Sequence, residues 1–267
     1  MPLHRTLAAS FLVVLIAGCG HALPGTARPQ AASAKLHARV VPNGYYQQAE
    51  GKAGAELLAA LHDVVVPHTD LGYDRARDVM FGLVDDMDGD DVVSCIYIGA
   101  AFDHVTNSKT AYRNGDGLNA EHTWPQSKGA VGPAKADLHH LFPAQVHANT
   151  VRSAYPFGIV AQSEWEEGGS KLGLDANGKR VFEPRDDHKG DTARALLYFY
   201  ACYGKVGSTD TSNFAVEAPV LAQWHQTDAV NDAERERNDA IYAAQGNRNP
   251  FVDRPEWVAA VGSFLPN

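Results

Sequence analysis

The stretch NAEHTWPQSKGAVGPAKADLHHLFPAQVHANTVRSAYPFG, residues 119–158, decides the fold predicted for this chain. It predicts a short strand that ends at Glu121-His122 and a loop punctuated by glycine and proline. A second strand at 137–142 and a helix at about 144–155 follow. Strand, loop, strand and helix in this order bring a carboxylate, an imidazole and the amide of Asn149 within reach of one another.

The three side chains suit metal-assisted hydrolysis. The oxygens of the Glu121 carboxylate and the Asn149 amide are hard ligands of the kind that Mg²⁺ prefers. His122 is a base that can be neutral at pH 7. Taken singly, each residue also has a structural explanation: a histidine at a strand end, a surface carboxylate and a solvent-facing asparagine.

Motifs inside and outside this stretch resemble one known family. EHTWPQS (121–127), DLHHLFP (137–143) and the Asn-x-x-Arg-Ser of NTVRSAYPFG (149–158) resemble the bacterial endonuclease I family of His-Me finger nucleases. FEPRDDHKGDTARA (182–195) and QGNRNPFVDRPEWV (245–258) look like scaffold of the same family. The resemblance implies an α+β fold, with a mainly helical scaffold around a ββα-metal (His-Me finger) core.

The resemblance also implies roles for the three residues. His122 is the general base that takes the proton of a water molecule, and Glu121 and Asn149 are the direct ligands of one Mg²⁺, with Ca²⁺ or Mn²⁺ as substitutes. Cleavage then leaves a 5′-phosphate and a 3′-hydroxyl. The substrate implied is DNA, extended to RNA, with little sequence specificity.

Arg152 shares the helix face of Asn149. It is predicted as a catalytic residue that binds a phosphate oxygen bidentately; the alternative is that it pairs with Asp137 or another acid and holds the helix. Four further residues are candidate substrate contacts: Trp124, Gln126, Lys128 and His140. For Trp124, a place in the hydrophobic core is the stronger alternative.

Two other metal sites are disfavoured. Zinc held by His122, His139 and His140 is unfavourable because adjacent strand residues diverge, and no HExxH or CxxC pattern is present. The acidic tract 85–91 (DDMDGDD) lacks the spacing and the terminal glutamate of an EF-hand. A solvated loop is the better interpretation of that tract.

The overall charge argues against a protein that coats nucleic acid. The chain has 23 basic and 32 acidic residues, a net charge of −9 and a pI near 5.7. Nucleic-acid binders usually carry a basic surface. Residues 104–160, however, hold five basic and three acidic residues, so that the central segment is locally positive.

The N-terminus and the cysteines indicate export. Residues 1–19 read as a secretory signal whose ending, Ile-Ala-Gly-Cys, resembles a lipobox with Cys19 as the lipidated residue; an ordinary signal cleaved near residue 22 is the alternative. Without Cys19, two cysteines remain, Cys95 and Cys202. In an oxidising compartment they form either a disulfide or two buried free thiols.

The remaining organisation follows from periodicity. Residues 20–43 are rich in Ala, Pro and Gly and predict a flexible tether, and residues 44–267 predict one nuclease-like domain. Predicted elements are helices at 51–65, 73–84, 219–226 and 228–245, a helix opening at 189–191 and running to about 203, a last short helix near 255, a buried strand at 92–99 and an irregular polar excursion at 163–178.

The sequence therefore predicts an exported endonuclease that acts as a monomer without a protein partner. It is held in the cell envelope, periplasmic or at the surface, by the lipid at Cys19, or is otherwise secreted. Two rivals stay open: a metal-dependent phosphodiesterase on a substrate other than nucleic acid, and a non-catalytic surface lipoprotein that keeps the fold for binding.

Overall fold

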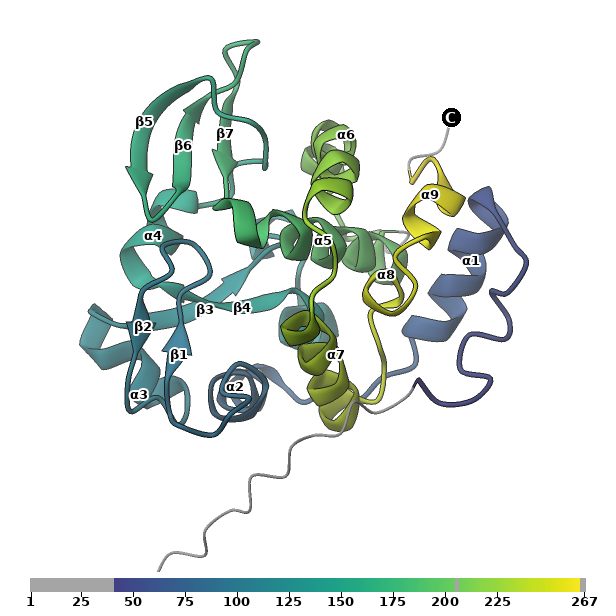
Figure 1. Ribbon diagram of the computed structural model, residues 1–267, viewed down its shortest axis with the longest axis horizontal. Coiled ribbons are helices and arrows are strands. Elements are labelled where there is room, and N and C mark those ends of the chain that lie inside the picture. Colours follow the sequence, from purple (N-terminus) through teal and green to yellow (C-terminus); the bar gives the residue numbers. More distant parts are fainter. Residues whose placement is uncertain (1–40, 205–206, 265–267) are drawn as a thin grey trace, which may run out of the picture. The chain divides into compact units, whose positions relative to one another are not determined.

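The computed structural model describes residues 41–204 and 207–264 of the chain (Figure 1). The predicted signal with Cys19 and nearly all of the predicted tether, 20–43, lie outside the described residues. Within the described ranges, no helix has both the length and the apolar character that crossing a membrane requires.

The predicted α+β class is confirmed, because helices and small antiparallel sheets both occur (Figure 1). The helices are α1 (Gly54–Val65), α2 (Tyr73–Val79), α3 (Ser108–Tyr112), α4 (Val146–Arg152), α5 (Lys189–Tyr203), α6 (Ser212–Thr227), α7 (Asp232–Gln245), α8 (Pro250–Asp253) and α9 (Trp257–Val261). A π-helical turn, Met80–Val84, continues α2. The helices predicted at 51–65 and 73–84 are thus close to the observed ones.

The described strands form three separate antiparallel sheets. They pair as β1 (Val93–Ser94) with β2 (Ala101–Phe102), as β3 (Leu118–His122) with β4 (Leu141–Gln145), and as β5 (Gln162–Glu167), β6 (Ser170–Leu174) and β7 (Arg180–Glu183) in that order. In the second sheet Glu121 lies opposite Phe142 and His122 opposite Leu141. The last strand of this sheet leads directly into α4.

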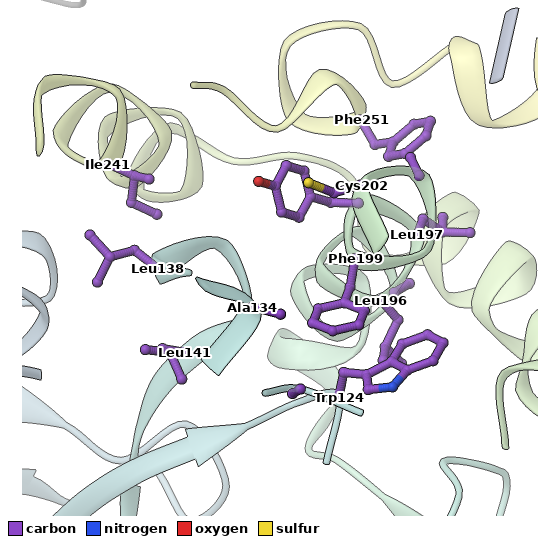
Figure 2. Close-up of a cluster of buried hydrophobic side chains, with 14 of the residues drawn as sticks. Trp124, Ala134, Leu138, Leu141, Leu196, Leu197, Phe199, Cys202, Ile241 and Phe251 are labelled. Carbon is purple, nitrogen blue, oxygen red and sulfur yellow. The ribbon is translucent and has the colours of Figure 1, made fainter. Parts of the chain in front are cut away.

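Helix α5 lies at the centre of the hydrophobic core. Its side chains are buried along almost its whole length, and it packs on α1, α6 and α8. Figure 2 shows Phe199 and Leu196 of α5 beside Trp124, whose indole stacks on the Phe199 ring at a centroid distance of 4.6 Å. Because Trp124 is 2 % exposed and its Nε1–H donates to the Lys128 carbonyl, it belongs to the core. Of the two alternatives for Trp124, the core position is the one that the structure shows.

The second strand and the helix of the central stretch differ from their predicted bounds. Leu138–His140 forms a 3₁₀ turn instead of a strand, because the Asp137 carboxylate accepts the backbone N–H of His139 and caps the turn. The strand therefore begins at Leu141. Helix α4 begins at Val146, where the Gln145 side chain accepts the N–H of Ala148, and it is shorter than predicted.

Two other stretches differ from the secondary structure predicted for them. The predicted strand at 92–99 has only Val93–Ser94 in ladder pairing, since the following residues turn and Ile96 N–H donates to the Pro143 carbonyl. The polar stretch 163–178 holds β5 and β6. Most β5 side chains are exposed, so the alternation of polar and apolar residues that marks a half-buried strand is absent.

Helix α6 also begins earlier than predicted, at Ser212, with Pro219 inside it. Proline favours the first turn of a helix, and for that reason the sequence predicted a start at this residue. Buried Phe214 and Glu217 hold the preceding turn in place instead. Cys95 and Cys202, at separate places in the core, are both free thiols, so the disulfide is not formed and the alternative of two buried thiols holds.

Candidate active site around His122

The end of β3 is covered by α4. The Asn149 side chain reaches back from α4 to β3, where its Nδ2 donates to Asn119 Oδ1 at 2.8 Å and lies 3.5 Å from the Ala120 carbonyl. One turn further along α4, Arg152 lies 3.2 Å from the Glu121 carboxylate. The face of α4 that carries Asn149 and Arg152 is thus the face that meets Glu121.

The His122 imidazole has a defined proton. Its Nε2 lies 3.1 Å from the backbone carbonyl of Lys135, and a carbonyl oxygen can only accept. The ring hydrogen therefore sits on Nε2, and Nδ1 carries the lone pair. Nδ1 faces the Nε2 amide of exposed Gln126 at 3.4 Å.

The His122 ring is neutral at physiological pH. Burial lowers its pKa to about 3, and the nearby His140, Lys135 and Arg152 contribute in the same direction, against the hydrogen bond to Lys135. The ring is 6 % exposed and lies 5.4 Å from the Tyr73 ring and 5.5 Å from that of His140. A neutral imidazole with a fixed tautomer has the protonation state of a general base.

Glu121 is a buried carboxylate rather than a surface one, with 2 % of its surface exposed. Its Oε1 accepts the hydroxyl of Tyr97 at 2.8 Å and is also the oxygen nearest to Arg152. Burial raises the pKa of Glu121, whereas Arg152 and Tyr97 oppose that rise. Tyr97 and Arg152 thus both meet Oε1 of this carboxylate.

Neighbouring strand residues point to opposite sides, and this holds at the end of β3. Glu121 contacts Tyr97 and Arg152, whereas His122 contacts Tyr73 and the Lys135 carbonyl. Arg152 connects the two positions, since its Nη1 lies 3.4 Å from the His122 carbonyl.

Arg152 is engaged within the protein. It is 1 % exposed, its Nη2 donates to the Thr123 carbonyl at 2.6 Å, and its Nη1 donates to the Ser153 carbonyl at 3.0 Å. Its guanidinium lies over the Phe157 ring at 4.5 Å. Of the two roles predicted for Arg152, the structure favours pairing with an acid and holding the helix. The acid is Glu121, not Asp137.

The chain matches the family model for endonuclease I over residues 53–256, most of its length. The protein belongs to the endonuclease I family. It is 35 % identical to the extracellular ribonuclease of Bacillus subtilis (strain 168) over 231 residues. These aligned residues make up 80 % of this chain and 76 % of that protein. It is 34 % identical over 247 residues to the extracellular ribonuclease of Bacillus amyloliquefaciens, with 86 % and 81 % covered. An extracellular deoxyribonuclease of Aeromonas hydrophila is 29 % identical over 120 residues, 45 % of this chain and 50 % of that protein.

Two further candidate residues of this endonuclease I relative have internal partners. Lys128 Nζ donates to Asp210 at 2.8 Å and to Ser212 at 3.2 Å. His140 is fully buried, its Nε2 lies 2.6 Å from the Ala134 carbonyl, and burial lowers its pKa to about 4. His140 therefore packs against His122 as a neutral, fully buried ring, and of the predicted substrate contacts Gln126 is the one that is both exposed and next to His122.

Sequence reasoning missed Tyr97, Tyr73 and the carbonyl of Lys135. Tyr97 lies in the stretch predicted as a buried strand, so its phenol was counted as core. Tyr73 is the first residue of α2, and the sequence pattern around it predicts a helix but no contact with His122. No side-chain pattern reports which carbonyl holds a histidine, because every residue has one.

The donor atoms around Glu121 fit a hard divalent cation. With Nδ2 of Asn149 directed at acceptors on β3, its Oδ1 is the atom left for a ligand. A carboxylate oxygen and an amide oxygen are ligands of the kind that Mg²⁺ takes together with water molecules.

Among the described residues, two groups of three His, Cys or Asp side chains bring possible ligand atoms within 4.8 Å of one another, and neither contains Glu121 or His122. In the group of His68, Asp137 and Cys202, both Asp137 oxygens already accept two hydrogen bonds each. In the acidic tract the group is Asp86, Asp88 and Asp90, with the last two exposed. Asp85, in the same tract, pairs with Arg237 at 2.8 Å.

Proposed function

We propose that this protein is an exported, Mg²⁺-dependent endonuclease that hydrolyses phosphodiester bonds of DNA and RNA with little sequence specificity. The observation that carries the proposal is the His122 ring, whose Nε2–H is fixed on the Lys135 carbonyl, so that the lone pair for a proton is on Nδ1, next to the Gln126 amide. The Asn149 amide reaches the end of the strand that carries Glu121 and His122. Family membership supports the same reaction class.

In the proposed mechanism, His122 Nδ1 removes a proton from water as the oxygen attacks phosphorus. The P–O3′ bond breaks, and the products are a 5′-phosphate and a 3′-hydroxyl that takes up a proton. When bound, Mg²⁺ would be held by Glu121 and Asn149 and would stabilise the negative charge on the phosphate and the leaving oxygen. Ca²⁺ or Mn²⁺ can take its place at the same oxygens.

Tyr97 and Arg152 act as positioning residues in this scheme. Both hold Oε1 of Glu121, and Arg152 also holds the carbonyls of His122 and Thr123 at the end of β3. The β3–β4–α4 unit thus serves as the ββα-metal core, and its rigidity comes from a buried guanidinium. Gln126, at the exposed side of Nδ1, is placed to contact substrate.

Both DNA and RNA are proposed as substrates because the attacking water comes from solvent. The reaction does not use the 2′-hydroxyl, so either sugar is compatible with it. The relatives point the same way, since two are named extracellular ribonucleases and another an extracellular deoxyribonuclease. Those names also support export, and we propose a monomer held in the cell envelope by a lipid at Cys19.

Cleavage of plasmid DNA and of a structureless RNA with and without Mg²⁺ tests the proposal. Cleavage should require the cation, stop in EDTA and leave 5′-phosphate ends. Glu121→Gln should weaken calorimetric Mg²⁺ binding and cleavage together, whereas Glu166→Gln on exposed β5 is the matched control. Hydrolysis of a small phosphodiester without cleavage of either polymer would favour the phosphodiesterase, and Mg²⁺ binding without any turnover would favour the binding protein.

A further inference from the structure

Three side chains from α2 and the loop before β4 gather beside His122. The Tyr73 ring lies 5.4 Å from the His122 ring, Lys135 Nζ lies over the Tyr73 ring at 4.3 Å, and the Arg77 guanidinium lies over the same ring at 4.7 Å. All three side chains are partly exposed. We call Tyr73, Arg77 and Lys135 the cation–tyrosine cluster.

Lys135 is connected to His122 through both its backbone and its side chain. Its backbone carbonyl accepts Nε2–H of His122, and its ammonium group rests on the ring that contacts His122. Within the described residues, no carboxylate lies within ion-pair distance of Lys135. A cation without a counter-ion on a chain of net charge −9 indicates a ligand that carries negative charge.

Arg77 is the second cation of the cluster. It pairs with Asp74 at 2.6 Å, but this acid is 91 % exposed, so the pair is weak and an incoming anion can replace it. The cations of Lys135 and Arg77 both lie over the Tyr73 ring. The ring therefore serves to hold these two side chains and not to stack a base. Helix α2 packs on the 3₁₀ turn Gly132–Ala136, which carries Lys135.

We propose that Lys135, with Arg77 beside it, forms a phosphate-binding subsite for the phosphate next to the one that is cleaved. This inference rests on the proposed nuclease function. A nucleic-acid strand carries one phosphate per nucleotide, so a strand whose scissile phosphate lies at Nδ1 of His122 brings its neighbour past the cluster. The subsite would favour oligonucleotides over dinucleotides without selecting sequence.

The test compares two substrates, a dinucleotide with one phosphodiester and a decanucleotide of the same base. In Lys135→Gln, the ratio of kcat/KM for the decanucleotide to that for the dinucleotide should fall roughly tenfold, the loss of one charged hydrogen bond. Lys135→Arg should restore the ratio. Arg75→Gln removes a positive charge from the exposed side of the same helix, α2, and should keep the wild-type ratio.

Salt dependence gives a second readout. Binding of a fluorescent single-stranded decanucleotide to the His122→Ala protein is measured between about 50 and 200 mM NaCl. Added Lys135→Gln should make the slope of log affinity against log salt shallower by about 0.7, the value for one phosphate contact on a single strand. Added Arg75→Gln should not change the slope.

The outcomes separate the two proposals. If the wild-type protein cleaves nucleic acid but Lys135→Gln and Arg75→Gln give the same ratio and slope, the subsite is wrong and the nuclease stands. An equal loss in Lys135→Arg and Lys135→Gln would also overturn the subsite, because it would indicate disturbance of the loop. If the wild-type protein cleaves no nucleic acid, the proposed function fails first.

Discussion

Two buried carboxylates in this molecule have opposite surroundings. Asp137 sits in a closed network in which both oxygens are filled: Oδ1 accepts His139 N–H and Gln245 Nε2, and Oδ2 accepts the Tyr198 and Tyr203 hydroxyls. In Glu121, the Tyr97 hydroxyl and the Arg152 guanidinium both meet Oε1. Both acids are almost completely buried, and both have histidines nearby.

The pKa values of the two acids are shifted in opposite directions, in agreement with their different surroundings. Burial alone would raise the pKa of Asp137, but the neighbouring histidines and the hydrogen bonds lower it to about 2. The pKa of Glu121 is raised, because its partners do not offset burial. The comparison teaches that burial of an acid and a histidine does not mark an active site. The two acids differ in how their side-chain donors are distributed: four donors are shared between both oxygens of Asp137, whereas Tyr97 and Arg152 meet a single oxygen of Glu121.

The largest effect is expected at the open site. His122→Ala should reduce nuclease activity by about 10³-fold, within the range that general-base catalysis supplies, because no other described group accepts the water proton at that position. The free energy of unfolding should change little in comparison. His147→Ala, an exposed histidine on α4, is the control. Comparable losses in both variants would show that the cleavage assay does not report on the base.

A substitution in the closed network around Asp137 should change the stability of the protein and not its catalytic rate. Asp137→Asn places an amide N–H₂ against groups that donate, so we expect a loss of about 3 kcal/mol in the free energy of unfolding, measured with urea. The folded variant should keep most of its kcat. Glu121→Gln should instead lose activity, and because it also breaks the buried pair with Arg152 it should lose stability as well. If both acids affected stability alone, the distinction drawn between them would collapse.

Glu217 of α6 is an intermediate case. It is buried and accepts the backbone N–H of Phe157 at 2.7 Å, and burial raises its pKa to about 7 from an ordinary value of 4.5. The folded state thus binds this proton more tightly than the unfolded chain, and the stabilisation it gives at low pH is lost as pH rises from about 4.5 to 7.

Glu217→Gln removes this titration. Relative to the wild type, the variant should gain stability between pH 4.5 and 8, by on the order of 2 kcal/mol, measured as the difference in unfolding free energy at each pH. Glu236→Gln, on the exposed face of α7, should show no such trend. A constant difference across the range would mean that Glu217 is ionised throughout.

The smallest effect is expected from reduction. Because Cys95 and Cys202 are free and buried, adding dithiothreitol should leave the thermal unfolding midpoint of the purified protein within about 1 °C of its value without reductant. Mass spectrometry after alkylation of the unfolded protein should find both thiols. A disulfide that closed so long a loop would instead lower the midpoint by many degrees on reduction.

The sequence by itself determined the local parts of this protein. Apolar residues at helical spacing predicted 51–65 and 73–84, and the strand end at Glu121-His122 followed by a loop, a strand and a short helix was present in the chain order. These features depend on neighbours a few residues apart, so the sequence contains the information directly.

Only the tertiary structure decided which polar groups are used internally and which are left open. Arg152 pairs with Glu121 across 31 positions, Lys128 with Asp210, and Asp137 with Tyr198 and Tyr203. Trp124 turned inward onto Phe199, and the His122 tautomer was set by a backbone carbonyl. Such partners are brought together by packing of distant elements, and no local spacing encodes which donor meets which acceptor.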